Sequence, residues 1–172
     1  AKLKSQGVSE HVLSAIYKGR FNPYLINASH VIENSLLTPL DNNNDISNYL
    51  ATINSLAQKA SVRLLVVYVP YHVVVSDYYY RYSNELGSKF IAPTLTSPNF
   101  RIHQNYLAKL CLEKKIEFID TTSAIESIEN TGVHLYHRYD QHLNKDGYRI
   151  VAEEISRCIK SKVSYSNFRL QK

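Results

Sequence analysis

The sequence has few cysteines, and their placement argues against a zinc-binding module. Only Cys111 and Cys158 occur among the 172 residues, each inside a segment with the hydrophobic spacing of an amphipathic helix. Neither has zinc-type partner residues at close spacing. We therefore expect two buried thiols, and a Cys111–Cys158 disulfide stays open at this point.

Long apolar runs and dense basic runs are also absent. No uninterrupted apolar stretch approaches the roughly 18 residues that a membrane-spanning helix needs, so no such segment is predicted. The net charge of +5 comes from scattered lysines and arginines without a nucleic-acid motif, which favours a solvated basic surface over a nucleic-acid partner. No signal peptide is recognisable, and the first residue is Ala rather than Met, so we expect a processed form or a piece of a longer protein.

An alternation of helix and strand patterns is present instead. The aliphatic run from Leu64 to Val69 ends at Pro70 and suits a strand buried on both faces, as in a parallel sheet. The rhythm of the whole chain predicts one layered α/β domain over residues 1–172. Helices are predicted over residues 8–18, 46–60, 100–115 and 146–163, and strands over 61–70 and 116–120.

Two of these predicted helices, 46–60 and 146–163, have apolar residues at helical spacing that are expected to face the core. Asp45 is a candidate N-cap for the first of them. The expected inward residues are Ile46, Leu50, Ile53, Ala57, Ile150, Val151, Ile155 and Ile159.

Candidate site residues follow from the position of the strands. In open α/β sheets, sites form in the crevice beyond the carboxyl ends of the strands. Tyr71 and His72 follow the first predicted strand and Asp120 ends the second, so these residues and a histidine-rich stretch at 134–142 are expected at one edge. Tyr71 and His72 are predicted to bind substrate, although a histidine there can equally cap backbone groups. Asp120 is expected to cap the next helix.

The histidine-rich stretch HLYHRYDQHLNKDGY contains His134, His137, Asp140 and His142 within nine residues. These side chains supply enough donors for zinc or a similar ion. The segment has the pattern of an extended chain or loop, which would place His134, Asp140 and His142 on one side and turn His137 away. A metal site therefore remains one of the alternatives.

A second interpretation of this stretch is an acid–base pair. Asp140 and His142 can lie on the same side of an extended turn, so the carboxylate can orient the imidazole while the second ring nitrogen accepts a proton. Asn144 or Asp146 is expected to cap the following helix. The third alternative is that His142 only makes a hydrogen bond within a loop.

The segment YDQHLNKDGYRIVAEEI resembles the last block of the SGNH (GDSL-like) hydrolase and acyltransferase superfamily. There an Asp and a His precede a short turn, a Gly–aromatic pair and a helix reading Val-Ala followed by acidic residues. The Asp-x-His spacing looks more like the branch related to polysaccharide O-acetyltransferases of the alginate type than the commoner Asp-x-x-His. The strand ending VYVPYH, the helix at 100–114 and the strand IEFID also resemble the C-terminal half of that family, so the resemblance covers about residues 45–162.

The resemblance implies a three-layer α/β/α sandwich with a mostly parallel sheet and serine-dependent ester chemistry on an acylated glycan. Asp140 would orient His142, which would serve as the general base, and no metal or organic cofactor would be required. It also implies a periplasmic or cell-envelope location. The alternative on the same fold is a non-catalytic glycan-binding or interaction domain.

The chain departs from the family pattern at the nucleophile. It contains no Gly-Asp-Ser block, and LGSKF at 86–90 lies in the wrong chain order. It also lacks a Gly-x-Asn-Asp block; Asn44 in NNND is a weak candidate for holding an oxyanion. The nucleophilic serine and the first strand are therefore expected upstream of Ala1.

A tyrosine-rich stretch follows the first predicted strand. Its aromatic side chains suit stacking on sugar rings, but a half-buried loop packed on the core explains them equally well. The residues are Tyr78, Tyr79, Tyr80 and Tyr82.

Overall fold

A computed structural model describes residues 2–37, 45–88 and 101–169. Helices dominate these residues, and the strands found there form two small sheets of two strands each. The elements are the helices α1 (Lys2–Ser5), α2 (Glu10–Tyr17), α3 (Tyr24–Leu37), α4 (Asp45–Lys59), α5 (His72–Val75), α6 (Asp77–Glu85), α8 (Ile102–Glu113), α9 (Thr122–Glu129) and α10 (Lys145–Arg169), and the strands β1 (Leu65–Tyr68), β2 (Glu117–Asp120), β3 (Tyr136–His137) and β4 (Asp140–Leu143).

The predicted parallel pairing of the two aliphatic strands is present. β1 and β2 run parallel, from the pair Leu65 and Glu117 to the pair Tyr68 and Asp120. Every residue of β1 is only half-buried, so the expectation of a strand buried on both faces was wrong. Within the described part of the chain β1 has β2 as its single neighbour, which leaves its other edge without the flanking strand that would complete the burial.

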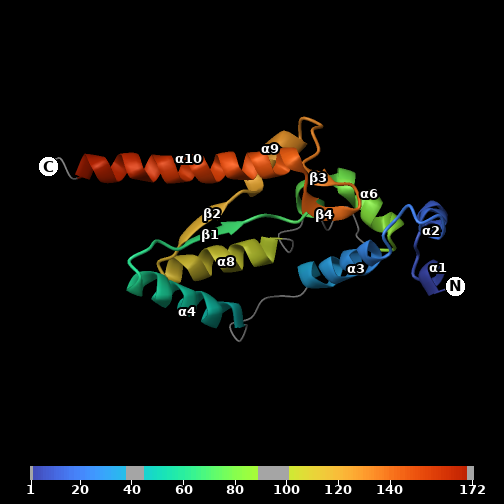
Figure 1. Ribbon diagram of the computed structural model, residues 1–172, viewed down its shortest axis with the longest axis horizontal. Helices are drawn as coiled ribbons and strands as arrows, with labels where there is room; N and C mark the ends of the chain where they lie inside the picture. Colours follow the sequence, from blue (N-terminus) through green and yellow to red (C-terminus); the bar gives the residue numbers. More distant parts are fainter. Residues whose placement is uncertain (1, 38–44, 89–100, 170–172) are drawn as a thin grey trace.

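Helices lie on two sides of these strands. In Figure 1, β1 and β2 run between α10 on one side and α4 and α8 on the other. α8 packs against β2, and the side-chain amide of Asn54 on α4 donates a hydrogen bond to the carbonyl of Lys114, just after α8. With only two strands paired in this sheet, the layered α/β class and the full three-layer sandwich both stay predictions.

The main hydrophobic core lies beyond the carboxyl end of β1. It joins α5, α6 and α9 to the hairpin of β3 and β4 and to the first turns of α10, and α3 contributes one leucine. Its buried members are Leu36, Val73, Val75, Tyr79, Ile125, Leu135, Tyr136, Leu143, Ile150 and Val151. A second, smaller cluster joins α2, α3 and the end of α6 through Val8, Val12, Leu13, Ile26 and Leu86.

Several elements differ from the sequence-based expectation. The tyrosine-rich stretch is helix α6, whose N-cap Ser76 accepts a hydrogen bond from the backbone N–H of Tyr78, and not a loop. α3, which begins directly after Pro23, was not predicted either. Ile53 on α4 and Ile159 on α10 are 47% and 42% exposed, so these two residues do not face the core as expected.

Both cysteines are free thiols. Cys111 is buried in α8, and its burial raises the pKa of the thiol. Cys158 on α10 is only partly buried, and its Sγ lies 3.6 Å from Oε1 of Glu154. The expectation of two buried thiols is therefore confirmed for Cys111 alone.

No helix in the described ranges combines the length and the apolar character that crossing a membrane requires. This agrees with the absence of long apolar runs in the sequence.

Asn144 fixes the point where the hairpin passes into α10. Its Oδ1 accepts hydrogen bonds from the backbone N–H groups of Asp146 and Gly147, each at 3.0 Å, which confirms Asn144 as the N-cap. Its Nδ2 donates to the carbonyl of His134 at 2.7 Å, and its backbone N–H donates to Leu135. The backbone of α10 approaches so closely that a Cβ at Gly147 would lie 2.2 Å from the carbonyl oxygen of Leu135.

We expect Asn144→Ala to lower the free energy of unfolding by about 1–3 kcal/mol, because it removes both the helix cap and the hydrogen bond to His134. Urea denaturation followed by circular dichroism measures this change. Asp146→Ala in the same helical turn is the control, because Asp146 is exposed and takes part in one long ion pair, 3.7 Å from Arg149. Equal losses in the two variants would contradict the role given to Asn144.

Candidate functional site

The candidate site lies on the antiparallel hairpin formed by β3 and β4, with Arg138 and Tyr139 in the turn. Tyr136 anchors the hairpin beyond the carboxyl end of β1, because its hydroxyl donates a 2.6 Å hydrogen bond to the carbonyl of Pro70. The backbone N–H of Tyr136 donates to the hydroxyl of Tyr79 on α6. The histidine-rich segment therefore reaches the strand end where the topology predicted a site.

A buried carboxylate secures the start of the hairpin. Glu129, the last residue of α9, accepts hydrogen bonds from the hydroxyl of Tyr79 at 2.6 Å and from the backbone N–H of Leu135 at 2.7 Å. Its second oxygen lies 3.2 Å from Nδ1 of His134. The side chain of Glu129 has no exposed surface, so these three groups take the place of water as its hydrogen-bond partners. No pattern in the sequence indicated this role for Glu129.

Asp140 and His142 form the expected pair. Nδ1 of His142 lies 2.5 Å from Oδ1 of Asp140, and the same oxygen accepts a hydrogen bond from the backbone N–H of His142 at 3.0 Å. The carboxylate thus fixes the imidazole in orientation and leaves Nε2 on the opposite edge of the ring. The side chain of His142 is 66% exposed, so a substrate can reach it.

The environment of Asp140 favours its charged form. Partial burial alone would raise the pKa of this carboxyl, but the hydrogen bonds from the backbone and ring of His142 oppose burial. Together with the nearby rings of His142 and His137 they hold the pKa below its ordinary value. Asp140 is therefore an anion at neutral pH, as an orienting group must be.

The other two histidines of the stretch do not lie as expected. His137 faces Asp140 across the turn as its register partner instead of pointing away from it. His134 does not share a side with Asp140 and His142. It stacks on the ring of Tyr78, with centroids 3.4 Å apart, and pairs with Glu129.

This arrangement bears on the metal alternative. In residues 2–37, 45–88 and 101–169, no three His, Cys, Asp or Glu side chains are placed to hold a metal ion together. His134 is occupied by Glu129, while His142 is occupied by Asp140. The geometry therefore supports a pair of residues, not a three-residue ligand set.

The two residues predicted to bind substrate, Tyr71 and His72, differ in accessibility. His72 is 5% exposed, between the rings of Tyr79 and Tyr136, and no described group makes a hydrogen bond to its Nδ1. Burial lowers the pKa of His72 to about 4, although the charge of Asp140 acts in the opposite direction. His72 is thus neutral at pH 7 and close enough to Asp140 to respond to its charge. Tyr71 is half-buried against the main core.

Asp120 at the end of β2 has the structural role that was expected. Its Oδ1 accepts a hydrogen bond from the backbone N–H of Thr122 at the start of α9, and its Oδ2 accepts one from the side chain of Gln104. Burial, with the charge of Asp120, raises the pKa of Tyr68 to about 12. Asp120 thus links the end of β2 to the start of α9 and to Gln104 on α8.

The serine of the Leu-Gly-Ser segment was not expected to be the nucleophile, and Asn44 was only a weak candidate for an oxyanion contact. The hydroxyl of Ser88, the serine of the Leu-Gly-Ser segment, is buried in a 2.6 Å hydrogen bond with Ser29. Asn44, the candidate for an oxyanion contact, lies outside the described residues.

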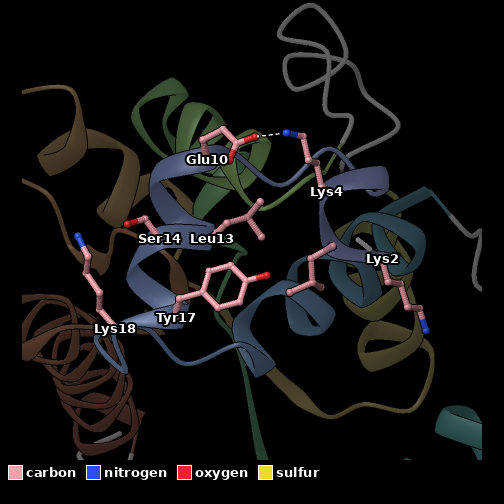
Figure 2. Close-up of a pocket in the computed structure, with 8 residues that line it drawn as sticks. Lys2, Lys4, Glu10, Leu13, Ser14, Tyr17 and Lys18 are labelled. Atoms are coloured by element: carbon pink, nitrogen blue, oxygen red, sulfur yellow. Dashed lines mark ion pairs between the residues drawn. The ribbon is translucent and has the colours of Figure 1, made fainter.

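A cavity of about 500 Å³ lies at the other end of the chain, between α1 and α2. Figure 2 shows lysines and Tyr17 around it, with the ion pair of Lys4 and Glu10 at its edge. Neither Asp140 nor His142 lines this cavity. The candidate catalytic pair is therefore a surface site on the hairpin and not part of this hollow.

No family model, curated protein or solved structure matches the chain. The resemblance to the SGNH superfamily therefore rests on the residues of the sequence that carry it.

The burial of His72 predicts a pH dependence of stability. Its pKa in the folded state, about 4, lies below the ordinary value near 6.5, so the unfolded chain binds the proton more tightly. The stability that depends on neutral His72 is complete above pH 6.5 and is lost as the pH falls toward 4, by up to about 3 kcal/mol. Urea unfolding between pH 7 and 4 measures this loss, and His72→Phe should flatten the slope. His137→Phe, at an exposed position, should leave the slope unchanged; two equal slopes would refute the assignment.

The pair also predicts the titration of Asp140. In the wild-type protein its carboxyl carbon should titrate with a midpoint below the ordinary value near 3.9. The stabilisation that this carboxylate contributes is present above that value and disappears as the pH falls through the lower folded pKa. In His142→Ala the midpoint should rise, because the ring hydrogen bond is gone while partial burial remains. Carbon NMR measures both midpoints, and an unchanged midpoint would contradict the pairing.

Proposed function

We propose that the chain carries the acid–base half of an SGNH-type serine esterase or O-acyltransferase that acts on an acylated glycan. The observation that supports it most directly is the Asp140–His142 contact, in which the carboxylate meets Nδ1 of an exposed imidazole. The family resemblance of the same residues supplies the reaction class and the glycan.

In the proposed reaction, Asp140 and His142 each have a defined role. Nε2 of His142 takes the proton of a serine hydroxyl while the serine oxygen attacks the acyl carbonyl, and the negative charge of Asp140 stabilises the resulting imidazolium. When the intermediate collapses, the imidazolium returns the proton to the departing sugar oxygen. Water or a second sugar hydroxyl then removes the acyl group from the serine by the same proton transfers.

The serine belongs, in this proposal, to a Gly-Asp-Ser block upstream of Ala1. His142 makes its hydrogen bonds with Asp140 in the described residues, so its Nε2 edge is where that hydroxyl would bind. His72, neutral and buried beside Asp140, and Tyr71 are proposed to border the substrate position.

The acid–base role predicts the effect of removing the imidazole. Full-length protein should release p-nitrophenol from p-nitrophenyl acetate, and His142→Ala should lower kcat by about 10²–10⁴-fold because the proton acceptor is lost. Asp140→Asn should also lower kcat, since the imidazolium loses its counter-charge. A fluorophosphonate probe should label one serine, and peptide mapping by mass spectrometry locates it.

His137→Ala is the matched control, because it removes a neighbouring exposed histidine and should leave kcat within about threefold. Chelators should have no effect. Loss of activity with a chelator and its return with zinc would favour a metal-dependent hydrolase. Sugar binding with neither turnover nor a labelled serine would favour a non-catalytic glycan-binding domain.

A further inference from the structure

Two arginines meet at the ring of Tyr82, one of them from the turn of the hairpin, and neither has a carboxylate partner among the described residues. Arg81 on α6 and Arg138 in the hairpin turn are both exposed, and no described acidic group makes an ion pair with either. The guanidinium carbon of Arg81 lies 4.8 Å from the ring centroid of Tyr82, and that of Arg138 lies 5.9 Å from the same centroid. One tyrosine ring therefore brings together two positive charges from different elements.

Tyrosines hold these guanidinium groups in place. Arg81 also lies 4.9 Å from the ring centroid of Tyr78, and its Nη2 donates a 3.1 Å hydrogen bond to the hydroxyl of Tyr82. The hydroxyl of Tyr82 donates in turn to the hydroxyl of Tyr78. Contacts with aromatic faces orient an arginine without neutralising it, so its remaining N–H donors stay available to a ligand. We call Tyr78, Arg81, Tyr82 and Arg138 the tyrosine–arginine cluster.

Three acidic residues near the cluster are already engaged, and a fourth, Asp77 at the start of α6, is exposed and makes no ion pair with Arg81. Glu85 accepts a hydrogen bond from Tyr139 at 2.6 Å and lies 3.1 Å from His11. Glu129 is buried with its own donors, and Asp140 is paired with His142. A hydrogen bond from Tyr82, and smaller effects of Arg138 and Arg81, lower the pKa of Tyr78 against the effect of its burial. The cluster thus has donors and positive charge but no anion.

We propose that the tyrosine–arginine cluster binds an oxyanion, a carboxylate or a phosphate, carried by the glycan substrate. Planar guanidinium groups match the two oxygens of such a group and bind it through paired hydrogen bonds. Arg138 is two residues from Asp140 in the hairpin, so a sugar whose charged group is held by the cluster lies next to the candidate pair. This inference rests on the proposed function in taking the ligand to be a glycan, and it deepens that proposal by naming an anionic one.

The test measures binding to the full chain by isothermal titration calorimetry at pH 7. The probes are trigalacturonate, glucose 6-phosphate, inorganic phosphate and the neutral trisaccharide maltotriose. We expect an anionic sugar to bind at least about tenfold more tightly than maltotriose, and Arg81→Gln/Arg138→Gln to remove that preference. The probe that binds best, carboxylated or phosphorylated, identifies the oxyanion.

A matched double variant separates a site from general charge attraction. Lys59→Gln/Lys115→Gln removes the same charge at exposed positions ahead of the amino ends of β1 and β2, and it should change affinity by less than about twofold. Equal weakening in both double variants, equal binding of maltotriose, or no binding of any anionic probe overturns the oxyanion site. Circular dichroism confirms that each variant is folded.

The outcome is independent of the esterase assay. Arginine-dependent binding without ester turnover supports the oxyanion site and counts against the catalytic proposal. Ester turnover without a preference for anionic sugars supports the catalytic proposal and counts against the oxyanion site.

Discussion

The buried carboxylate of Glu129 is the constraint on which the candidate site depends. A polar side chain without contact to water is costly unless it has hydrogen-bond partners, and here Tyr79, Leu135 and His134 provide them. These donors come from α6 and from the segment that leads into β3, while Glu129 itself ends α9. The hydrogen bonds of this one carboxyl group therefore bring three separate parts of the chain into contact. These contacts set the position of the hairpin.

The rigidity that the proposed proton transfer requires follows from this arrangement and not from deep burial of the pair. His142 is largely exposed, but its neighbours on both sides are fixed, by Tyr136 bonded to Pro70 and by Asn144 bonded to His134. A surface imidazole can thus keep one orientation while remaining open to a polymeric substrate. His72 adds a neutral buried ring behind the pair, whose protonation would place a second charge close to Asp140.

The sequence predicted those features that depend on neighbouring residues. The spacing of apolar residues located α2, α4, α8 and α10, the aliphatic run located β1, and Asp140, His142 and Asn144 have the local contacts expected of them. Prediction from the sequence failed where the interaction partner of a residue lies far along the chain. Glu129 has the sequence context of an exposed helix end, and its bond with Tyr79 spans 50 residues. α6 was missed because tyrosines favour strands and loops in isolation, whereas here the packing of Tyr79 in the core outweighs that preference.

The two-stranded sheet has a consequence for how the chain behaves among other proteins. β1 and β2 pair with each other, and within the described ranges the outer edge of each strand has no ladder partner. Such edges present backbone N–H and carbonyl groups in register, and β1 combines them with half-buried aliphatic side chains. A strand from the same polypeptide or from another molecule could extend the sheet there without disturbing the hairpin. If nothing covers it, the same edge favours self-association. The tendency to self-associate and the geometry of the candidate pair therefore depend on different parts of the chain.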